Sequence, residues 1–117
     1  AGVAESTFSN YRDVAQEVAP ALAPLATWMV SSGLDPEDSL PALAPRPLLL
    51  MHGKQDQLIP FAVAQRTLEQ ALAAGVPAWL IATNTGHRSA WFSMPEEYER
   101  EVLTFWREAL RGGLSAR

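Results

Sequence analysis

Residues 47–60 read PLLLMHGKQDQLIP, and this stretch decides the fold. The apolar run 48–51 is too short for an ordinary helix and is bounded by Pro47 and Gly53. Such a run is typical of a strand that is buried on both faces of a parallel sheet. Asp56 follows in a polar turn, so its carboxylate is expected just past the carboxyl end of the strand. Open α/β sheets collect ligands and catalytic groups at that edge.

A second polar site follows a second apolar run. Residues 79–82 read WLIA, and residues 83–87 read TNTGH. If both runs are strands of one parallel sheet, Asp56 and His87 leave it at the same edge, where an aspartate can orient an imidazole for base catalysis. Each residue alone has an ordinary explanation, because Asp is a common turn former and a loop His is usually a hydrogen-bonded surface group. The hypothesis of a catalytic pair therefore rests on their spacing: one strand-helix-strand unit separates them, which would place both after neighbouring strands.

The other histidine, His52, stands at the end of the first apolar run beside Gly53. We interpret it as a partly buried histidine that is bonded to the backbone, and not as a base. His52 and His87 have no carboxylate at ligand spacing between them, so they make a poor metal site. Neither a metal nor another cofactor is therefore expected.

The composition indicates one ordinary globular domain. The chain has 117 residues, of which 48% are hydrophobic and 19% charged, which is typical of soluble proteins. The formal charge of -4 comes from interleaved acidic and basic residues, so neither nucleic acid nor an anionic membrane surface is an expected partner. The absence of cysteine excludes disulfides and thiolate metal sites. We find no signal-peptide pattern and no run long enough to span a membrane, so the expected location is cytoplasmic by default.

Patterning along the rest of the chain predicts alternating strands and helices. Residues 2–6 read as the end of a short strand, and helical patterns follow at 8–18 and 22–30. Residues 31–47 have the Pro, Ser and Asp content of a connecting segment. The prolines leave room in it for one helical turn at 39–43.

The last strand is expected at 78–82, with one predicted helix before it and one after it. The last helix is expected to start with a capping box of Ser93 and Glu96 around Pro95. The order of elements predicts an α/β fold with about three parallel strands and flanking helices. The apolar face of the helix at 61–74 consists of Ala64, Leu68, Ala71 and Leu72. The apolar stripe of the last helix consists of Tyr98, Val102, Phe105, Trp106 and Ala109.

The stretch HGKQDQLIP at 52–60, followed by the Gly86-His87 pair, resembles the C-terminal half of the α/β-hydrolases. In particular, it resembles the bacterial branch that is similar to serine aminopeptidases, prolyl-oligopeptidase-like and dienelactone-hydrolase-like enzymes. In that family the triad acid follows a strand that ends in His-Gly-x-x-Asp, and the triad histidine follows the last strand. The resemblance therefore implies that Asp56 is the acid and His87 the base, with no cofactor.

The resemblance extends over nearly the whole chain. Residues 4–11, AESTFSNY, are similar to the strand and helix after the family's nucleophile, and PEEY at 95–98 is similar to the opening of its last helix. It implies that residues 1–117 form part of an α/β-hydrolase domain. Within that part, residues 19–46 are implied to be a lid-like or connecting segment.

One departure from the family bears on activity. The family's nucleophile lies in Gly-x-Ser-x-Gly, which does not occur here; Ser6 and Ser9 lack the flanking glycines and are not assigned as nucleophiles. The resemblance implies that the chain begins after the nucleophile, so the chain alone is expected to be inactive. The partial sheet would have an open edge near Val3, which we expect another chain or a second copy to cover.

Two functions remain as alternatives. The first is the C-terminal segment of a serine hydrolase, which supplies the triad acid and base for hydrolysis of a small-molecule ester or amide. The second is a non-catalytic, truncated hydrolase-like module that acts in assembly or binding through its open strand edge and the apolar stripe around Trp106. No residue pattern indicates the substrate.

Overall fold

The structure is a computed structural model that describes residues 1–8, 20–22 and 35–114. Its elements are β1 (Gly2–Glu5), 3₁₀ turns at Pro20–Leu22 and Pro36–Ser39, α3 (Leu40–Leu43), β2 (Leu48–Gly53), α4 (Phe61–Ala73), β3 (Ala78–Thr83), α5 (Ala90–Ser93) and α6 (Pro95–Leu110). The short helical turn predicted in the connecting segment is present as α3. The helices predicted at 8–18 and 22–30 lie almost wholly outside the described residues, and the interpretation of 19–46 as lid-like or connecting stays a prediction. None of the described helices is long and apolar enough to cross a lipid bilayer.

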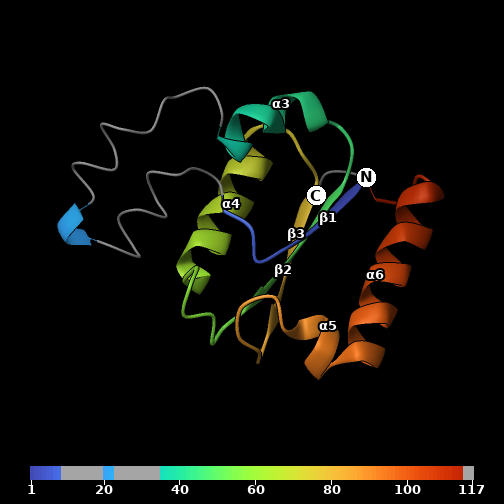
Figure 1. The fold of residues 1–117 in the computed structure, drawn as a ribbon. Coiled ribbons are helices and arrows are strands. Elements are labelled where there is room, and N and C mark those ends of the chain that lie inside the picture. The colour runs from blue at the N-terminus through green and yellow to red at the C-terminus, as the bar shows by residue number, and fades with distance from the viewer. Residues whose placement is uncertain (9–19, 23–34, 115–117) are drawn as a thin grey trace.

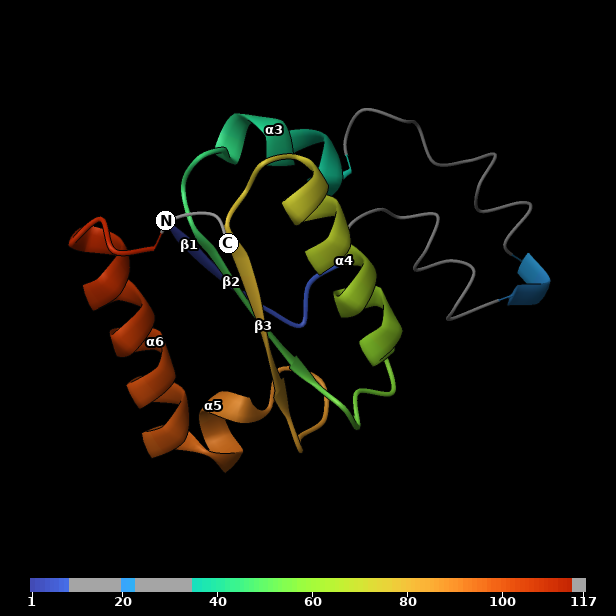
Figure 2. The same ribbon diagram turned by 180° about the vertical axis from the view of Figure 1, so that it is seen from behind.

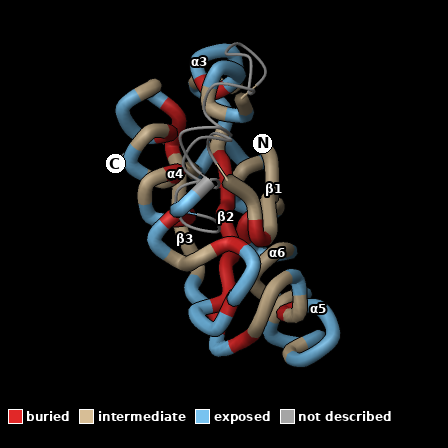
Figure 3. The backbone as a smooth tube through the Cα atoms, turned by 60° about the vertical axis from the view of Figure 1, so that its left-hand side comes forward, coloured by how far each residue is buried: buried red, intermediate tan, exposed pale blue. Residues whose placement is uncertain are grey.

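The strands form one parallel sheet in the order β1-β2-β3, which confirms the predicted α/β fold. Leu49 of the central strand β2 lies opposite Val3 of β1 and Trp79 of β3. Figures 1 and 2 show α3 and α4 on one face of this sheet and α6 on the other. All six residues of β2 are buried, as Figure 3 shows by colour, so the prediction of a strand covered on both faces is confirmed.

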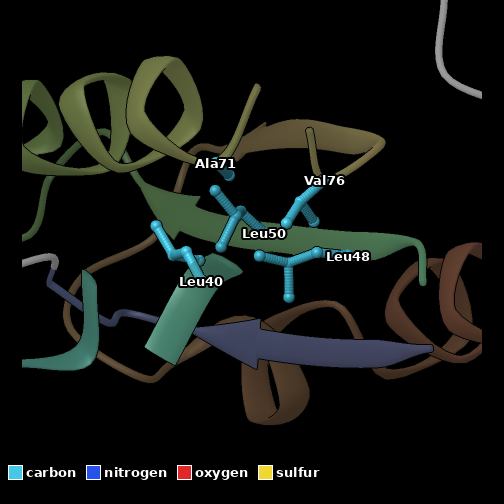
Figure 4. Close-up of a cluster of buried hydrophobic side chains, with 5 residues drawn as sticks. All are labelled: Leu40, Leu48, Leu50, Ala71 and Val76. Atoms are coloured by element: carbon cyan, nitrogen blue, oxygen red, sulfur yellow. The ribbon is translucent and has the colours of Figure 1, made fainter. Parts of the chain in front are cut away.

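The side chains of β2 alternate between two apolar cores, as the two-residue period of a strand requires. Leu48 and Leu50 pack on the face that α3 and α4 cover (Figure 4). Leu49 and Met51 pack on the opposite face with Phe105 of α6. Burying one such side chain stabilises a fold by about 2 kcal/mol. Both faces of β2 are therefore packed, which fixes the position of the loop that starts at its end.

The helix predicted at 61–74 is present as α4, and most of its predicted apolar face is packed. Leu72 is the exception: it is 48% exposed, so its assignment to that face is wrong. Leu72 follows the buried Ala71 by one residue, and a rotation of about 100° per residue carries it away from the sheet. The buried residues of α4 are Val63, Ala64, Thr67 and Ala71.

The capping box predicted for the last helix is wrong. Ser93 ends the short helix α5, and its N–H donates to the carbonyl of Ser89 at 2.9 Å. Ser93 therefore lies inside a helical turn and is not free to cap the next one. The N-cap of α6 is Met94, without a side-chain cap bond, and Pro95 occupies the first turn as predicted.

Four of the five residues of the predicted apolar stripe of α6 pack on the sheet, and the fifth, Ala109, is half-buried outside that core. The ring of Phe105 in this stripe meets the ring of Trp79 in β3 edge-on, with 6.2 Å between the ring centroids. Trp106 packs against the same core, so the stripe is not the free docking surface that the second functional hypothesis required. The α6 residues packed on this face are Tyr98, Val102, Phe105 and Trp106.

Candidate active site

Asp56 lies in the loop directly after β2, and its side chain is fully buried. Its Oδ1 accepts hydrogen bonds from the backbone N–H groups of Leu58 at 2.9 Å and Ile59 at 2.8 Å. An aspartate that bonds the backbone two and three residues ahead folds the turn around its own carboxylate. The local sequence therefore fixes the direction of this carboxylate and leaves Oδ2 for other partners.

His87 lies in the loop after β3, and its ring meets the same carboxylate. Nδ1 of His87 is 2.9 Å from Oδ2 of Asp56. Because an ionised carboxylate only accepts hydrogen bonds, Nδ1 carries the proton and donates. In the neutral ring, Nε2 then holds the free electron pair. The side chain is 28% exposed, and no residue in the described part of the chain hydrogen-bonds Nε2.

The two loops can meet because β2 ends in Gly53. We call residues 54–60 the acid loop and residues 84–90 the base loop. The N–H of Gln55 in the acid loop donates to the carbonyl of Thr85 in the base loop at 3.1 Å. A Cβ atom at Gly53 would lie 2.1 Å from that same carbonyl oxygen, which is an impossible contact. Glycine at the strand end therefore permits the approach that brings Asp56 and His87 together.

His52 is buried beneath the acid loop and bonds its backbone. It is 1% exposed, and its Nε2 lies 2.7 Å from the carbonyl oxygen of Ile59. Since a carbonyl only accepts, Nε2 donates to it, and the same nitrogen is 3.3 Å from Oδ2 of Asp56. The interpretation of His52 as a histidine bonded to the backbone is confirmed, although the residue is more deeply buried than expected. No cluster of three or more His, Cys, Asp or Glu side chains suited to a metal ion occurs among the described residues.

Burial and hydrogen bonding act in opposite directions on Asp56. Burial raises the pKa of the carboxyl, because it disfavours the charged form. The hydrogen bonds from Ile59, His87 and Leu58 and the charge of His87 lower it, and their sum is larger. The pKa of Asp56 is therefore below its ordinary value, and the carboxylate is ionised at neutral pH, as an orienting residue requires.

The lowered pKa of Asp56 predicts an acid-dependent loss of stability. The ionised carboxylate stabilises the fold above its unfolded-state pKa of about 4, and this contribution is lost as pH falls through the lower folded-state pKa. We expect the free energy of unfolding, measured with urea from pH 7 to pH 3, to fall less steeply below pH 4 in Asp56→Asn than in the wild type. Glu69→Gln, which alters an exposed carboxyl on α4, should retain the wild-type slope. Equal slopes in all three proteins would show that Asp56 is not the linked group.

Ser6 is part of this region, which sequence reasoning did not predict. It follows β1 with a φ of 52°, a left-handed conformation that side chains rarely adopt, and Arg88 in the base loop has a φ of 49°. The hydroxyl of the buried Ser6 accepts a hydrogen bond from the N–H of Arg88 at 3.0 Å. No local signal identifies this contact, because the two residues are 82 positions apart in the sequence.

The chain has an α/β fold with one parallel sheet of three strands, and Asp56 and His87 meet at the carboxyl edge of that sheet. No family model matches the sequence, and a search of curated proteins found no match. Among solved structures the chain is similar to the Pyrococcus furiosus esterase Pf2001 in two crystal forms, with TM-scores of 0.69 and 0.66 and 20% identity in both. Each alignment covers 92% of this chain and 44% or 43% of the esterase, so the likeness is one of fold over less than half of the esterase's length.

Proposed function

We propose that Asp56 and His87 are the acid and base of a serine hydrolase that cleaves a small-molecule ester or amide. The observation that carries this proposal is the 2.9 Å contact between Nδ1 of His87 and the buried carboxylate of Asp56, which leaves Nε2 open. Nε2 takes the proton of a serine hydroxyl during attack and returns it to the leaving group. Asp56 holds the required tautomer and stabilises the imidazolium. This chemistry needs no cofactor.

The nucleophilic serine is proposed to come from polypeptide outside these 117 residues. The sequence has no Gly-x-Ser-x-Gly elbow, and the hydroxyl of Ser6 is already bonded beneath the base loop. The chain matches only 44% of the length of the similar esterase. We therefore propose that the nucleophile belongs to a further part of the full-length protein. The oxyanion donors are proposed to lie with the nucleophile. Membership of the serine-aminopeptidase-like branch, and a cytoplasmic location, stay predictions.

A fluorophosphonate probe tests this proposal, because it reacts with a serine that a neighbouring base activates. We expect the native full-length protein to be labelled on one serine outside residues 1–117, and the heat-denatured protein to remain unlabelled. Mass spectrometry of the labelled peptide identifies the serine. Labelling of Ser6, or no labelling of the native protein, would contradict the proposal.

The alternative function is a binding or assembly module, and the free edge of β1 favours it. Within the described residues β1 pairs with β2 alone, so its other edge is open. A cavity of about 370 Å³ lies on the face of the sheet that α3 and α4 cover, and its lining includes Ala4 of β1, Leu43 and Leu50. In either function, another chain or a second copy is proposed to cover this edge. An unlabelled native protein that dimerises through β1 would favour the module over the enzyme.

A further inference from the structure

Two side chains from the end of β1 hold the base loop. Oγ of Ser6 accepts a hydrogen bond from the N–H of Arg88 at 3.0 Å, and Oε1 of Glu5 accepts one from the N–H of Ala90 at 3.2 Å. His87 immediately precedes the first of these N–H groups. The base loop is therefore anchored on β1 through its backbone, while the ring of His87 is anchored on the β2 side through Asp56.

The contact between Ser6 and Arg88 joins two strained residues. Both have positive φ values, 52° and 49°, although both carry a Cβ atom. Such conformations persist only where the surrounding structure determines them strongly, and they cluster at functional sites. The hydrogen bond is buried on the side of Ser6, which is 6% exposed, so its loss would leave the Arg88 N–H without that partner.

Ser6 is not the serine that His87 activates. Its hydroxyl oxygen is bonded to the backbone of the base loop and not to the ring. Within the part of the chain that the structure describes, neither Ser6 nor any other residue hydrogen-bonds Nε2 of His87. The strained backbone of Ser6 therefore requires an explanation other than a nucleophile elbow.

We propose that Ser6 and Glu5 are positioning residues that set the direction of the His87 ring by anchoring the base loop on β1. This inference rests on the proposed function, because it assigns a purpose to that direction. A single bond from Nδ1 to Asp56 lets the ring pivot about the carboxylate. A second anchor on the adjoining backbone removes that freedom and fixes where Nε2 points, to the precision that proton transfer from a serine needs.

Replacement of Ser6 tests the anchor with a kinetic and a spectroscopic measurement. Ser6→Ala removes the acceptor, and Ser6→Gly removes it while also relieving the left-handed backbone. Both variants are expected to lower kcat for p-nitrophenyl acetate by about 10-fold to 100-fold at nearly constant KM. Both should also broaden or shift the downfield Nδ1 proton resonance of His87, which is assigned by its loss in His87→Gln. Ser93→Ala, an exposed serine that ends α5, should leave both measurements unchanged.

The outcomes separate this inference from the proposed function. If His87→Gln leaves hydrolysis unchanged, the proposed function is wrong, and the Nδ1 resonance still tests the anchor. If hydrolysis needs His87 but both Ser6 variants keep kcat and the resonance, the anchor is wrong. Retention of both in Ser6→Gly alone would assign the effect to strain and overturn the proposed hydrogen bond. Should neither Ser6 variant fold, Glu5→Ala tests the second anchor, at Ala90, by the same two measurements.

Discussion

Replacement of His87 by Gln is expected to lower kcat/KM of the full-length protein for p-nitrophenyl acetate by about five to six orders of magnitude. Glutamine has a similar size but cannot take a proton from a serine hydroxyl, so the nucleophile remains neutral. The stability should change little, because the His87 side chain is 28% exposed and, among the described residues, bonds only Asp56. Steady-state kinetics together with a urea unfolding curve measures both effects.

A matched control keeps this result specific to the ring. Lys54 is an exposed polar residue of the acid loop, and Lys54→Gln should leave kcat/KM within about twofold of the wild type. An undiminished kcat/KM in His87→Gln would end the assignment of His87 as the base. Equal losses in both variants would indicate damage to the loops in general and not the removal of a base.

Replacement of Gly53 by Ala is expected to have the largest effect on stability. The added Cβ would lie 2.1 Å from the carbonyl oxygen of Thr85 and 2.6 Å from that of Gly86, so the backbone of the base loop has to move. Gly53 ends the fully buried strand β2, which cannot shift to relieve the contact. We expect a loss of about 3 kcal/mol in the free energy of unfolding, and a loss of the contact between Asp56 and His87.

Gly86→Ala is the matched control for this experiment. A Cβ at Gly86 would meet Oγ of Ser89 at 3.4 Å, an ordinary contact, and Gly86 does not have a positive φ. We expect a change below about 1 kcal/mol in urea unfolding. The downfield Nδ1 proton of His87 should persist in Gly86→Ala and disappear in Gly53→Ala. A Gly53→Ala protein with wild-type stability and an intact resonance would show that the two loops do not depend on glycine at this position.

The central strand and the two polar sites after the strands could be predicted because their signals are local. The apolar run at 48–51 between Pro47 and Gly53 suits a strand buried on two faces, and the structure buries all of β2. The carboxyl ends of parallel strands meet at one edge, so Asp56 and His87 were expected to come together there, and they do. Their catalytic roles stay a proposal.

The errors arose where a local pattern competes with a neighbouring element. Ser93 has the spacing of an N-cap before Pro95, but its N–H donates to the carbonyl of Ser89, which places Ser93 in α5. Leu72 continues the apolar pattern of α4, but the direction in which the helix packs on the sheet leaves it 48% exposed. The first error depends on where the neighbouring helix α5 ends, and the second on which side of α4 faces the sheet. A window of about ten residues contains neither fact.

The sequence by itself determined the order of the three strands and of α4 and α6, the burial of β2 on both faces, and the presence of an acid and an imidazole after successive strands. Apolar runs and turn-forming residues act over short distances, so these features could be predicted locally. Only the tertiary structure decided that these two side chains touch across 31 residues, that Gly53 leaves room for their approach, and that Ser6 meets Arg88 across 82 residues. Such contacts depend on the path of the backbone in three dimensions, since hydrogen bonds and steric contacts form over a few ångströms in space whatever the separation along the chain.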